Sequence, residues 1–315
     1  MSNPADTQKI QVKNIAFTAS VIIAVAWALI FPTHFTSWGD FKLSALIIPL
    51  LMAIMFGMGT TMSIKDFAGV IKMPRAILVG LLCQFSIMPV IGFFLVLVAD
   101  LPAEIAAGVI LVGSSPSGLA SNVMSFISKS NLALSITLTA CATVIAPFST
   151  PLLMKLLASS YVPIDALAML WSITKIVLLP IIGGLIFNHF LYERFKIFEK
   201  IMPIFSMAGI TFIIAIITAS GRDSILSIGF LLIGIVLLHN SIGYVLGYGL
   251  STLLGMDKKS ARTIAFEVGL QNSGLASGIA VEMGKIATMG LAPALFSIIQ
   301  NITGSILAAF WRKEK

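Results

Sequence analysis

Ten apolar runs, each about as long as a lipid bilayer core is thick, determine what this chain can fold into. A helix needs about 20 apolar residues to cross that core. The chain is 58% hydrophobic and 10% charged, with a mean hydropathy of +1.02, which is more apolar surface than a soluble domain of 315 residues can bury. The runs therefore predict an all-α polytopic membrane protein with ten transmembrane helices. They cover residues 15–31, 43–62, 74–98, 102–128, 131–157, 165–190, 201–219, 225–254, 261–284 and 288–311.

The first run also has a second interpretation. Lys9 and Lys13 precede it and Ala24-Val25-Ala26 lies within it, a pattern that also occurs in signal peptides. Because the run is long enough to span a bilayer, we favour a transmembrane helix.

The second half of the chain repeats the first. Ser117-Gly118-Leu119-Ala120-Ser121 recurs letter for letter at residues 273–277, which is 156 positions later. The same offset places Leu81-Leu82-Cys83-Gln84 on Leu237-Leu238-His239-Asn240. Two matches in one register predict an internal duplication. Each half holds five predicted helices, an odd number, so the second copy must insert upside down, as in the inverted repeats of secondary transporters. The predicted repeats are 1–157 and 158–315.

Basic residues give the predicted orientation in the membrane. If the N-terminus is cytoplasmic, the outer loops hold only Lys42, Arg222 and Lys285. The inner segments then hold most of the 20 basic residues, so the positive-inside rule predicts that both termini are cytoplasmic. The net charge of +7 then needs no nucleic acid partner. The inner residues are Lys9, Lys13, Lys65, Lys72, Arg75, Lys129, Arg194, Lys196, Lys200, Lys258, Lys259, Arg262, Arg312, Lys313 and Lys315.

The fourth and ninth runs are interrupted at the same place in each half. Residues 113–118 read Gly-Ser-Ser-Pro-Ser-Gly and residues 269–274 read Gly-Leu-Gln-Asn-Ser-Gly. Proline lacks an N–H and glycine favours other backbone angles, so neither stretch suits a regular helix. Two ordinary kinks are the alternative, since glycine and proline are frequent in membrane helices. Paired breaks in corresponding helices are the better indication of a transporter binding site.

Glu267 is the most informative single residue, because it lies one turn before the ninth-run break. An acid inside a membrane segment is usually functional; the alternative is an ordinary interfacial ion pair with Arg262. Neutral oxygens together with one carboxylate suit a hard monovalent cation. Such oxygens occur in the equivalent helices at Gln84, Ser121, Asn122, Ser135 and Thr139.

At these residues the chain resembles the bile acid:sodium symporters, in particular the bacterial homologues of the apical sodium-dependent bile acid transporter. The resemblance is carried by Glu267-Val268-Gly269-Leu270-Gln271-Asn272-Ser273-Gly274 and by Ser121-Asn122-Val123-Met124, with Pro116 upstream, and it extends from about residue 40 to 311. It implies ten helices in two inverted repeats of five, in which helices 4 and 9 break and cross. It further implies a panel domain of helices 1, 2, 6 and 7 (15–62 and 165–219) and a core domain of helices 3–5 and 8–10 (74–157 and 225–311).

The resemblance also implies the site. Two sodium ions are expected as co-transported ligands, together with a small organic anion at the start of the second half-helix of helix 9. The first sodium site would use Ser121, Asn122, Ser135, Thr139 and Glu267. The second would use Gln84, Glu267, Gln271 and the main-chain carbonyls of Val268 and Leu270. The expected substrate residues are Asn272, Pro116, Leu119, Gln300 and Asn301.

These residues predict a sodium-coupled symporter that imports an organic anion by alternating access. Leu119 stands where a relative has Thr and Gln300 where it has His, so the anion stays open between a bile acid and a pantoate-like carboxylate. We expect a monomer in a bacterial inner membrane, in contact with lipid, with no catalytic residues and no enzymatic activity.

Three alternatives belong to other classes. A metalloid oxyanion exporter of the same fold would place a Cys at the first break, which here reads Gly113-Ser114-Ser115-Pro116. An intramembrane hydrolase would need a paired acid or an activated nucleophile, and neither His239 nor Lys175 has an evident partner. We expect His239 to pack between helices with one hydrogen bond, and Cys83 and Cys141 to be small packing residues. A non-coupled channel fits two breaks around a carboxylate less well than a carrier does.

Overall fold

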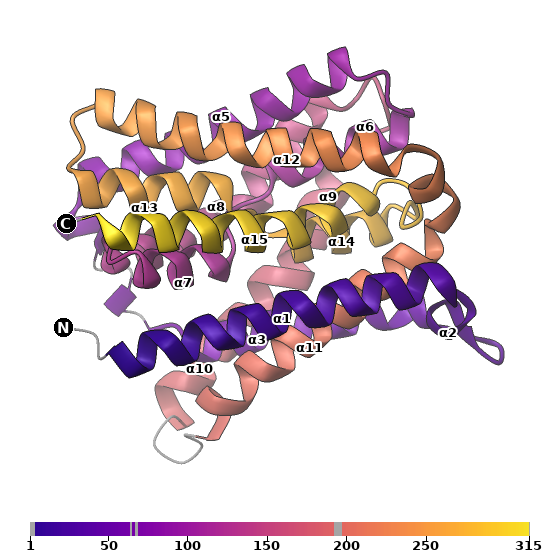
Figure 1. The fold of residues 1–315 in the computed structure, drawn as a ribbon, viewed down its shortest axis with the longest axis horizontal. Coiled ribbons are helices and arrows are strands. Elements are labelled where there is room, and N and C mark those ends of the chain that lie inside the picture. The colour runs from indigo at the N-terminus through magenta and orange to yellow at the C-terminus, as the bar shows by residue number, and fades with distance from the viewer. Residues whose placement is uncertain (1–3, 64, 67–68, 192–196, 315) are drawn as a thin grey trace.

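The protein is almost entirely helical in the computed structural model, which describes residues 4–63, 65–66, 69–191 and 197–314 (Figure 1). The described strands are the two-residue pair β1 (Ser37–Trp38) and β2 (Phe41–Lys42), which form an antiparallel hairpin. Of the basic residues counted above, Arg194, Lys196 and Lys315 lie outside the described residues. The helices are α1 (Pro4–Ile30), α2 (Thr33–Thr36), η1 (Leu43–Leu46), α3 (Ile47–Thr60), α4 (Gly69–Lys72), α5 (Pro74–Val98), α6 (Ala103–Ser114), α7 (Leu119–Ile127), α8 (Leu132–Leu157), α9 (Ala166–Ile173), η3 (Thr174–Leu178), α10 (Leu179–Leu191), α11 (Ile197–Ser220), α12 (Arg222–Leu253), α13 (Lys258–Gly269), α14 (Ser273–Glu282) and α15 (Leu291–Lys313).

Within the described ranges, six helical segments are long and apolar enough to cross a membrane. Large apolar side chains cover their outer surfaces; Phe230 is 96% exposed and Leu253 is 85% exposed, as expected for side chains that face lipid. The prediction of an all-α polytopic membrane protein is therefore confirmed. The six segments are Leu43–Thr60, Pro74–Val98, Leu132–Leu157, Ala166–Phe190, Arg222–Leu253 and Leu291–Lys313, and shorter apolar helices cover Ala16–Ile30, Ala103–Ser114 and Ile204–Ser220.

Several helices begin where an Asn or Asp side chain satisfies the free N–H groups of the first turn. Asp165 accepts from the N–H groups of the first turn of α9, and Asp257 does the same for α13. Asn131 caps α8, and Asn272 caps α14. The last of these caps starts a helix inside an apolar run, which is why one run becomes two helices.

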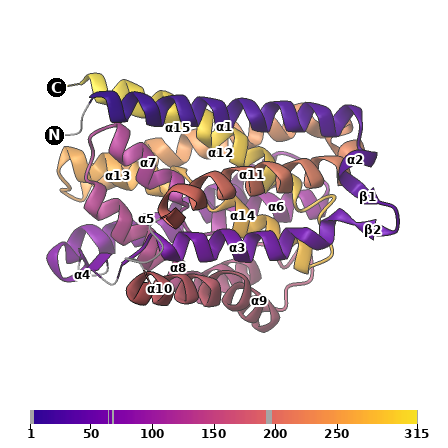
Figure 2. The ribbon, with the colours of Figure 1, turned by 90° about the horizontal axis from the view of Figure 1, so that it is seen from below.

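The helices lie in two groups. One group of neighbouring helices consists of α1, α3, α10 and α11. The second group lies beside it and includes α5, α8, α12, α13 and α15 (Figure 1). Figure 2, turned by 90°, shows the start of α1 and the end of α15 at one end of the molecule and the β1–β2 hairpin at the opposite end. The half-helix α14 packs against α3 of the first group, because Gly274 and Gly278 leave room for the side chain of Leu51.

The two breaks are shorter than the sequence predicts. Gly113 and Ser114 continue α6, so the first break is 115–118, and Gly269 ends α13 while Ser273 starts α14, so the second is 270–272. A glycine can sit in a helix when it is needed for packing; a Cβ on Gly113 would lie 2.6 Å from the carbonyl oxygen of Met88. The run 165–190 also departs from a regular helix, because η3 is a single π-helical turn.

Candidate functional site

The two breaks meet and hydrogen-bond to each other. The N–H of Gly118 donates to the carbonyl of Leu270 at 3.0 Å, and the N–H of Asn272 donates to the carbonyl of Pro116 at 2.8 Å. These bonds satisfy main-chain groups that no helix satisfies, which lipid could not do. A Cβ on Gly118 would lie 3.2 Å from the carbonyl oxygen of Gln271, so glycine permits the close approach. The ends of four half-helices are thereby fixed around one point.

Glu267 lies in the last turn of α13, its side chain is directed at the crossing of the two breaks, and it is 1% exposed. Its Oε1 accepts from the Ser135 hydroxyl at 2.6 Å, and its Oε2 accepts from the Ser117 hydroxyl at 2.6 Å. The Thr139 hydroxyl lies 3.2 Å from Oε1 and 3.0 Å from Oε2. The carboxylate is therefore surrounded by neutral hydroxyl groups from α8 and from the first break.

The alternative in which Glu267 pairs with Arg262 is wrong. Arg262 is bonded to Glu314, and its guanidinium carbon lies 5.4 Å from the centre of the Trp311 ring. Every hydrogen bond to the Glu267 carboxylate from the described residues comes from a hydroxyl group. A buried carboxylate without a basic partner carries a charge that is costly in a membrane protein, and a bound cation would offset it.

The first predicted set of sodium ligands converges on this carboxylate. Ser135 and Thr139 are four apart and share one face of α8. The Ser121 hydroxyl lies 3.2 Å from the Thr139 hydroxyl, and the Asn122 side-chain oxygen accepts from Thr139 at 3.3 Å. All five side chains are therefore within one connected group of oxygens.

Ser117 belongs to the same group, and the sequence reasoning did not include it among the ligands. Its hydroxyl makes one of the shortest contacts to the carboxylate, at 2.6 Å. The signal that pointed to it was the repeated pentapeptide, of which Ser117 is the first residue.

The second predicted set shares Glu267 with the first and adds Gln84 of α5 and groups at the second break. The Gln84 side-chain amide donates to the carbonyl of Ser115 at 3.0 Å and to the side-chain oxygen of Gln271 at 2.9 Å. Gln271 in turn donates to the carbonyl of Val268 at 2.5 Å, and the carbonyl of Leu270 faces the first break. The buried Oε1 of Gln84 has no hydrogen-bond partner in the described part of the chain.

The chemistry of both sets suits a hard cation. The contacting atoms are carboxylate, hydroxyl, amide and main-chain oxygens, which alkali and alkaline-earth ions prefer. The Oε1 of Gln84 accepts no hydrogen bond from the described residues, so it is available to bind a cation. Among the described residues, no three His, Cys, Asp or Glu side chains lie close enough together to hold a metal ion, which is the grouping that transition metals prefer.

The predicted substrate residues have different surroundings. Asn272 and Pro116 are buried in the breaks, and the Asn272 oxygen caps α14 by accepting from Leu275 at 3.0 Å. Leu119, at the start of α7, is 38% exposed. Gln300 is buried and bonded to the second break, and the amide of Asn301 donates to the carbonyl of Ser297 on its own helix at 2.6 Å. The structure brings Asn272, Pro116 and Gln300 to the crossing. Asn301 is the next residue of α15 after Gln300, and its side chain bonds its own helix instead.

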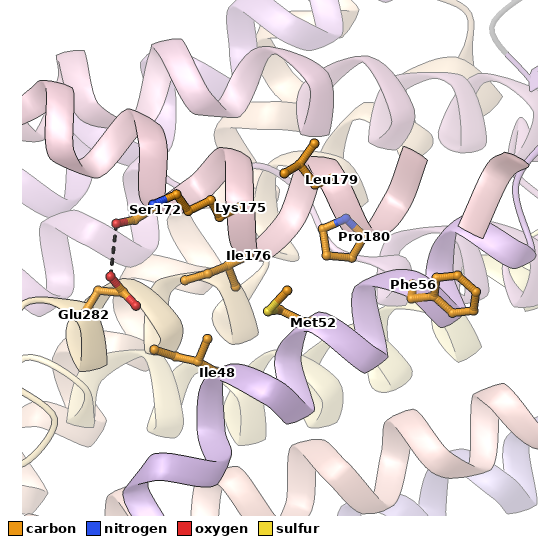
Figure 3. A pocket seen from close by; sticks show the side chains of 9 residues that line it. All are labelled: Ile48, Met52, Phe56, Ser172, Lys175, Ile176, Leu179, Pro180 and Glu282. Carbon is orange, nitrogen blue, oxygen red and sulfur yellow. Dashed lines mark hydrogen bonds between the residues drawn. The ribbon is translucent and has the colours of Figure 1, made fainter. Parts of the chain in front are cut away.

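A cavity of about 620 Å³ lies apart from the crossing, between α3, the α9–η3–α10 segment and α14 (Figure 3). The Ser172 hydroxyl donates to a carboxylate oxygen of Glu282 at 3.2 Å at one end of it. None of the predicted sodium or substrate residues lines it. The lining residues are Ile48, Met52, Phe56, Ser172, Lys175, Ile176, Leu179, Pro180 and Glu282.

The other residues singled out by the sequence have structural environments. The His239 Nε2 lies 2.8 Å from the carbonyl of Met88, and this is the single hydrogen bond expected for it. Cys83 is buried, Cys141 is half-buried, and both are free.

Comparison with known proteins agrees with the geometry. Residues 48–228 match the family model described as Sodium Bile acid symporter family. The chain is 41% identical over 295 residues to the sodium-dependent transporter YocS of Bacillus subtilis, covering 93% of this chain and 90% of that protein. It is 37% identical over 265 residues to the probable sodium/metabolite cotransporter BASS1, chloroplastic, of Arabidopsis thaliana, covering 84% of this chain and 66% of that protein.

An almost entirely helical membrane protein with a buried polar crossing, similar to proteins named as transporters, is a multi-pass membrane transporter. The chain belongs to the sodium bile acid symporter family. The expectation of a transporter rather than an enzyme is confirmed by these relatives, and their names support transport that depends on sodium.

Proposed function

We propose that the protein imports a small organic anion together with two sodium ions, which bind at the crossing around Glu267. The observation that carries this proposal is a buried carboxylate whose hydrogen bonds, within the described structure, all come from hydroxyl groups. One ion would take the oxygens of the first set and the other would take those of the second, including the unpartnered Gln84 oxygen. Each ion would offset part of the charge of Glu267.

The organic anion would bind beside the crossing, near Asn272. The half-helix α14 starts there, and the positive end of its dipole together with the bound cations would offset the charge of the anion. Leu119 is exposed next to the first break and would contact the apolar part of the molecule. A bile acid and a pantoate-like carboxylate both have this combination of an anionic group and apolar surface.

Ten transmembrane helices in two inverted repeats would provide the architecture. The spacing of the breaks supports this, because residue 115 of the first break and residue 271 of the second are 156 positions apart, the same offset as the repeated pentapeptide. The grouping of α1, α3, α10 and α11 supports a panel domain that is separate from a core. Rocking of the core against this panel would change the side from which the crossing is accessible.

We further propose a monomer in a bacterial inner membrane, and the arrangement of the ends supports cytoplasmic termini. The start of α1 and the end of α15 lie at one end of the molecule, and the hairpin that carries Lys42 lies at the other. This is the arrangement that the distribution of basic residues requires.

Binding measured in two salts tests the proposal. Purified protein would be titrated with taurocholate and with pantoate by calorimetry, in sodium and again in potassium. We expect at least one of them to bind in sodium only, and Glu267→Ala to abolish that binding while the protein remains inserted and folded. Equal binding in both salts would remove sodium coupling.

A further inference from the structure

Three consecutive carbonyl groups at the end of α13 each accept one hydrogen bond, and each from a different source. The carbonyl of Val268 accepts from the side chain of Gln271, and that of Leu270 accepts from the N–H of Gly118. The carbonyl of Gly269, between them, accepts from the side-chain amide of Asn240 at 2.7 Å. The carbonyls of Val268 and Leu270 are the main-chain sodium ligands of the proposed second site. The carbonyl of Gly269 points to α12.

Asn240 binds this peptide with the amide nitrogen of its side chain, and the other end of the side chain is held by α15. Asn240 is 0% exposed, and its oxygen accepts from the Thr303 hydroxyl of α15 at 2.6 Å, which fixes the direction of its amide. Tyr244, four residues later on the same face of α12, covers Gly269, since a Cβ on that glycine would overlap the ring of Tyr244. Helix α12 therefore fixes both the carbonyl and the Cα of Gly269.

The next peptide is fixed from α15. The side chain of Gln300 accepts from the N–H of Gln271 at 2.7 Å and donates to the carbonyl of Gln271 at 3.0 Å. The peptides on both sides of Leu270 are thus held by side chains that are not among the proposed sodium ligands.

The predicted internal repeat relates Asn240 to a proposed sodium ligand. Asn240 occupies the position of Gln84 in the second repeat, since 84 plus 156 is 240. Each amide donates to a carbonyl of the broken helix in its own repeat, Gln84 to Ser115 and Asn240 to Gly269. The two differ in what is left over: the oxygen of Gln84 has no partner among the described residues, whereas that of Asn240 is bonded to Thr303.

We infer that Asn240 is a positioning residue for sodium: it orients the Gly269–Leu270 peptide so that the carbonyls of Val268 and Leu270 face the ion. Gln84 of the first repeat binds the ion directly. Asn240 of the second repeat holds the peptide in place, and its oxygen is already bonded to Thr303. This inference rests on the proposed function, because it concerns the carbonyl ligands of the proposed second site.

The test measures binding of ²²Na⁺ to purified protein by scintillation proximity, with thermal unfolding in sodium-free buffer as a second readout. Asn240→Leu removes the clamp at similar volume. His239→Leu is the matched control, because His239 is adjacent, equally buried, and bonded to a carbonyl that is not a proposed ligand. We expect Asn240→Leu to weaken sodium binding roughly fivefold or more, the scale of one lost buried hydrogen bond. We expect His239→Leu to bind sodium within about twofold of wild type at a similar loss of thermal stability.

The outcomes separate the inference from the function. If both variants weaken sodium binding equally, or neither does, the positioning role of Asn240 is overturned. If Asn240→Leu does not fold, Thr303→Val decides instead, since it removes the bond that orients the amide; unchanged sodium binding in that variant overturns the inference. If wild type itself shows no saturable sodium binding, the proposed function fails first.

Discussion

Replacing Thr139 by Val removes the hydroxyl group that joins the most oxygens at the crossing. That hydroxyl lies within 3.2 Å of both carboxylate oxygens of Glu267 and of the Ser121 hydroxyl. Valine has nearly the same shape, so the change deletes one oxygen and leaves the packing of α8 intact. A hydrogen bond to a charged group contributes about 1.5–3 kcal/mol. If an oxygen on sodium has the same scale, Thr139→Val weakens sodium affinity roughly 10- to 150-fold.

The control for this prediction is one turn further along α8. Thr143 is also buried, but its hydroxyl donates to the carbonyl of Thr139 at 2.7 Å and reaches no proposed ligand side chain. Thr143→Val therefore deletes a buried hydroxyl from the same helix without touching the site, and its sodium affinity should stay within about twofold of wild type. The assay is the concentration of sodium that gives half-maximal binding of ²²Na⁺. Equal affinities in the two variants would refute the assignment of Thr139 to the ion.

Three further predictions concern other parts of the molecule. Ser117→Ala should weaken sodium binding several-fold in the same assay, because it removes the 2.6 Å bond to Glu267, and an unchanged affinity would exclude Ser117 from the site. Arg262→Gln should lower the melting temperature, because Arg262 contacts Trp311 and Glu314, and should leave sodium affinity unchanged; a loss of affinity would mean that Arg262 does act on Glu267. Hydrogen bonds from Ser260 and the first-turn N–H groups hold the pKa of Asp257 below its ordinary value. Its contribution to stability is therefore fully present above about pH 4 and is lost as the pH falls through the lowered pKa. The difference in melting temperature between wild type and Asp257→Ala should accordingly disappear in acid, and a constant difference would contradict this.

The sequence predicted the two breaks because their causes are local. Glycine and proline mark the places where the helices stop, and the repeated pentapeptide relates the two places to each other. The same patterns predict breaks that are longer than those in the structure. Gly113 lies within α6, where packing requires a glycine, and Ser273 starts α14, which Asn272 caps. Short-range signals give the existence of a break but not its last residue.

The contacts of the site were less predictable where they join distant segments. The pairing of Ser117 with Glu267 spans 150 residues, and that of Gln300 with Gln271 depends on how α15 lies against α13. Gln300 stays a predicted substrate residue, and in the structure its side chain bonds the main chain of Gln271 and the hydroxyl group of Ser273. No periodicity in the sequence distinguishes a glutamine that binds a ligand from one that binds the backbone, because both are buried on a helix face.

Sodium binding without any organic substrate tests the central claim most directly, because the identity of the anion does not enter. Wild type and Glu267→Gln would be compared for saturable binding of ²²Na⁺ in detergent, with potassium as the competing ion. We predict saturable binding to wild type that sodium displaces and potassium does not, and its loss in Glu267→Gln. Equal sodium binding in the two proteins would contradict the assignment of the crossing as the sodium site.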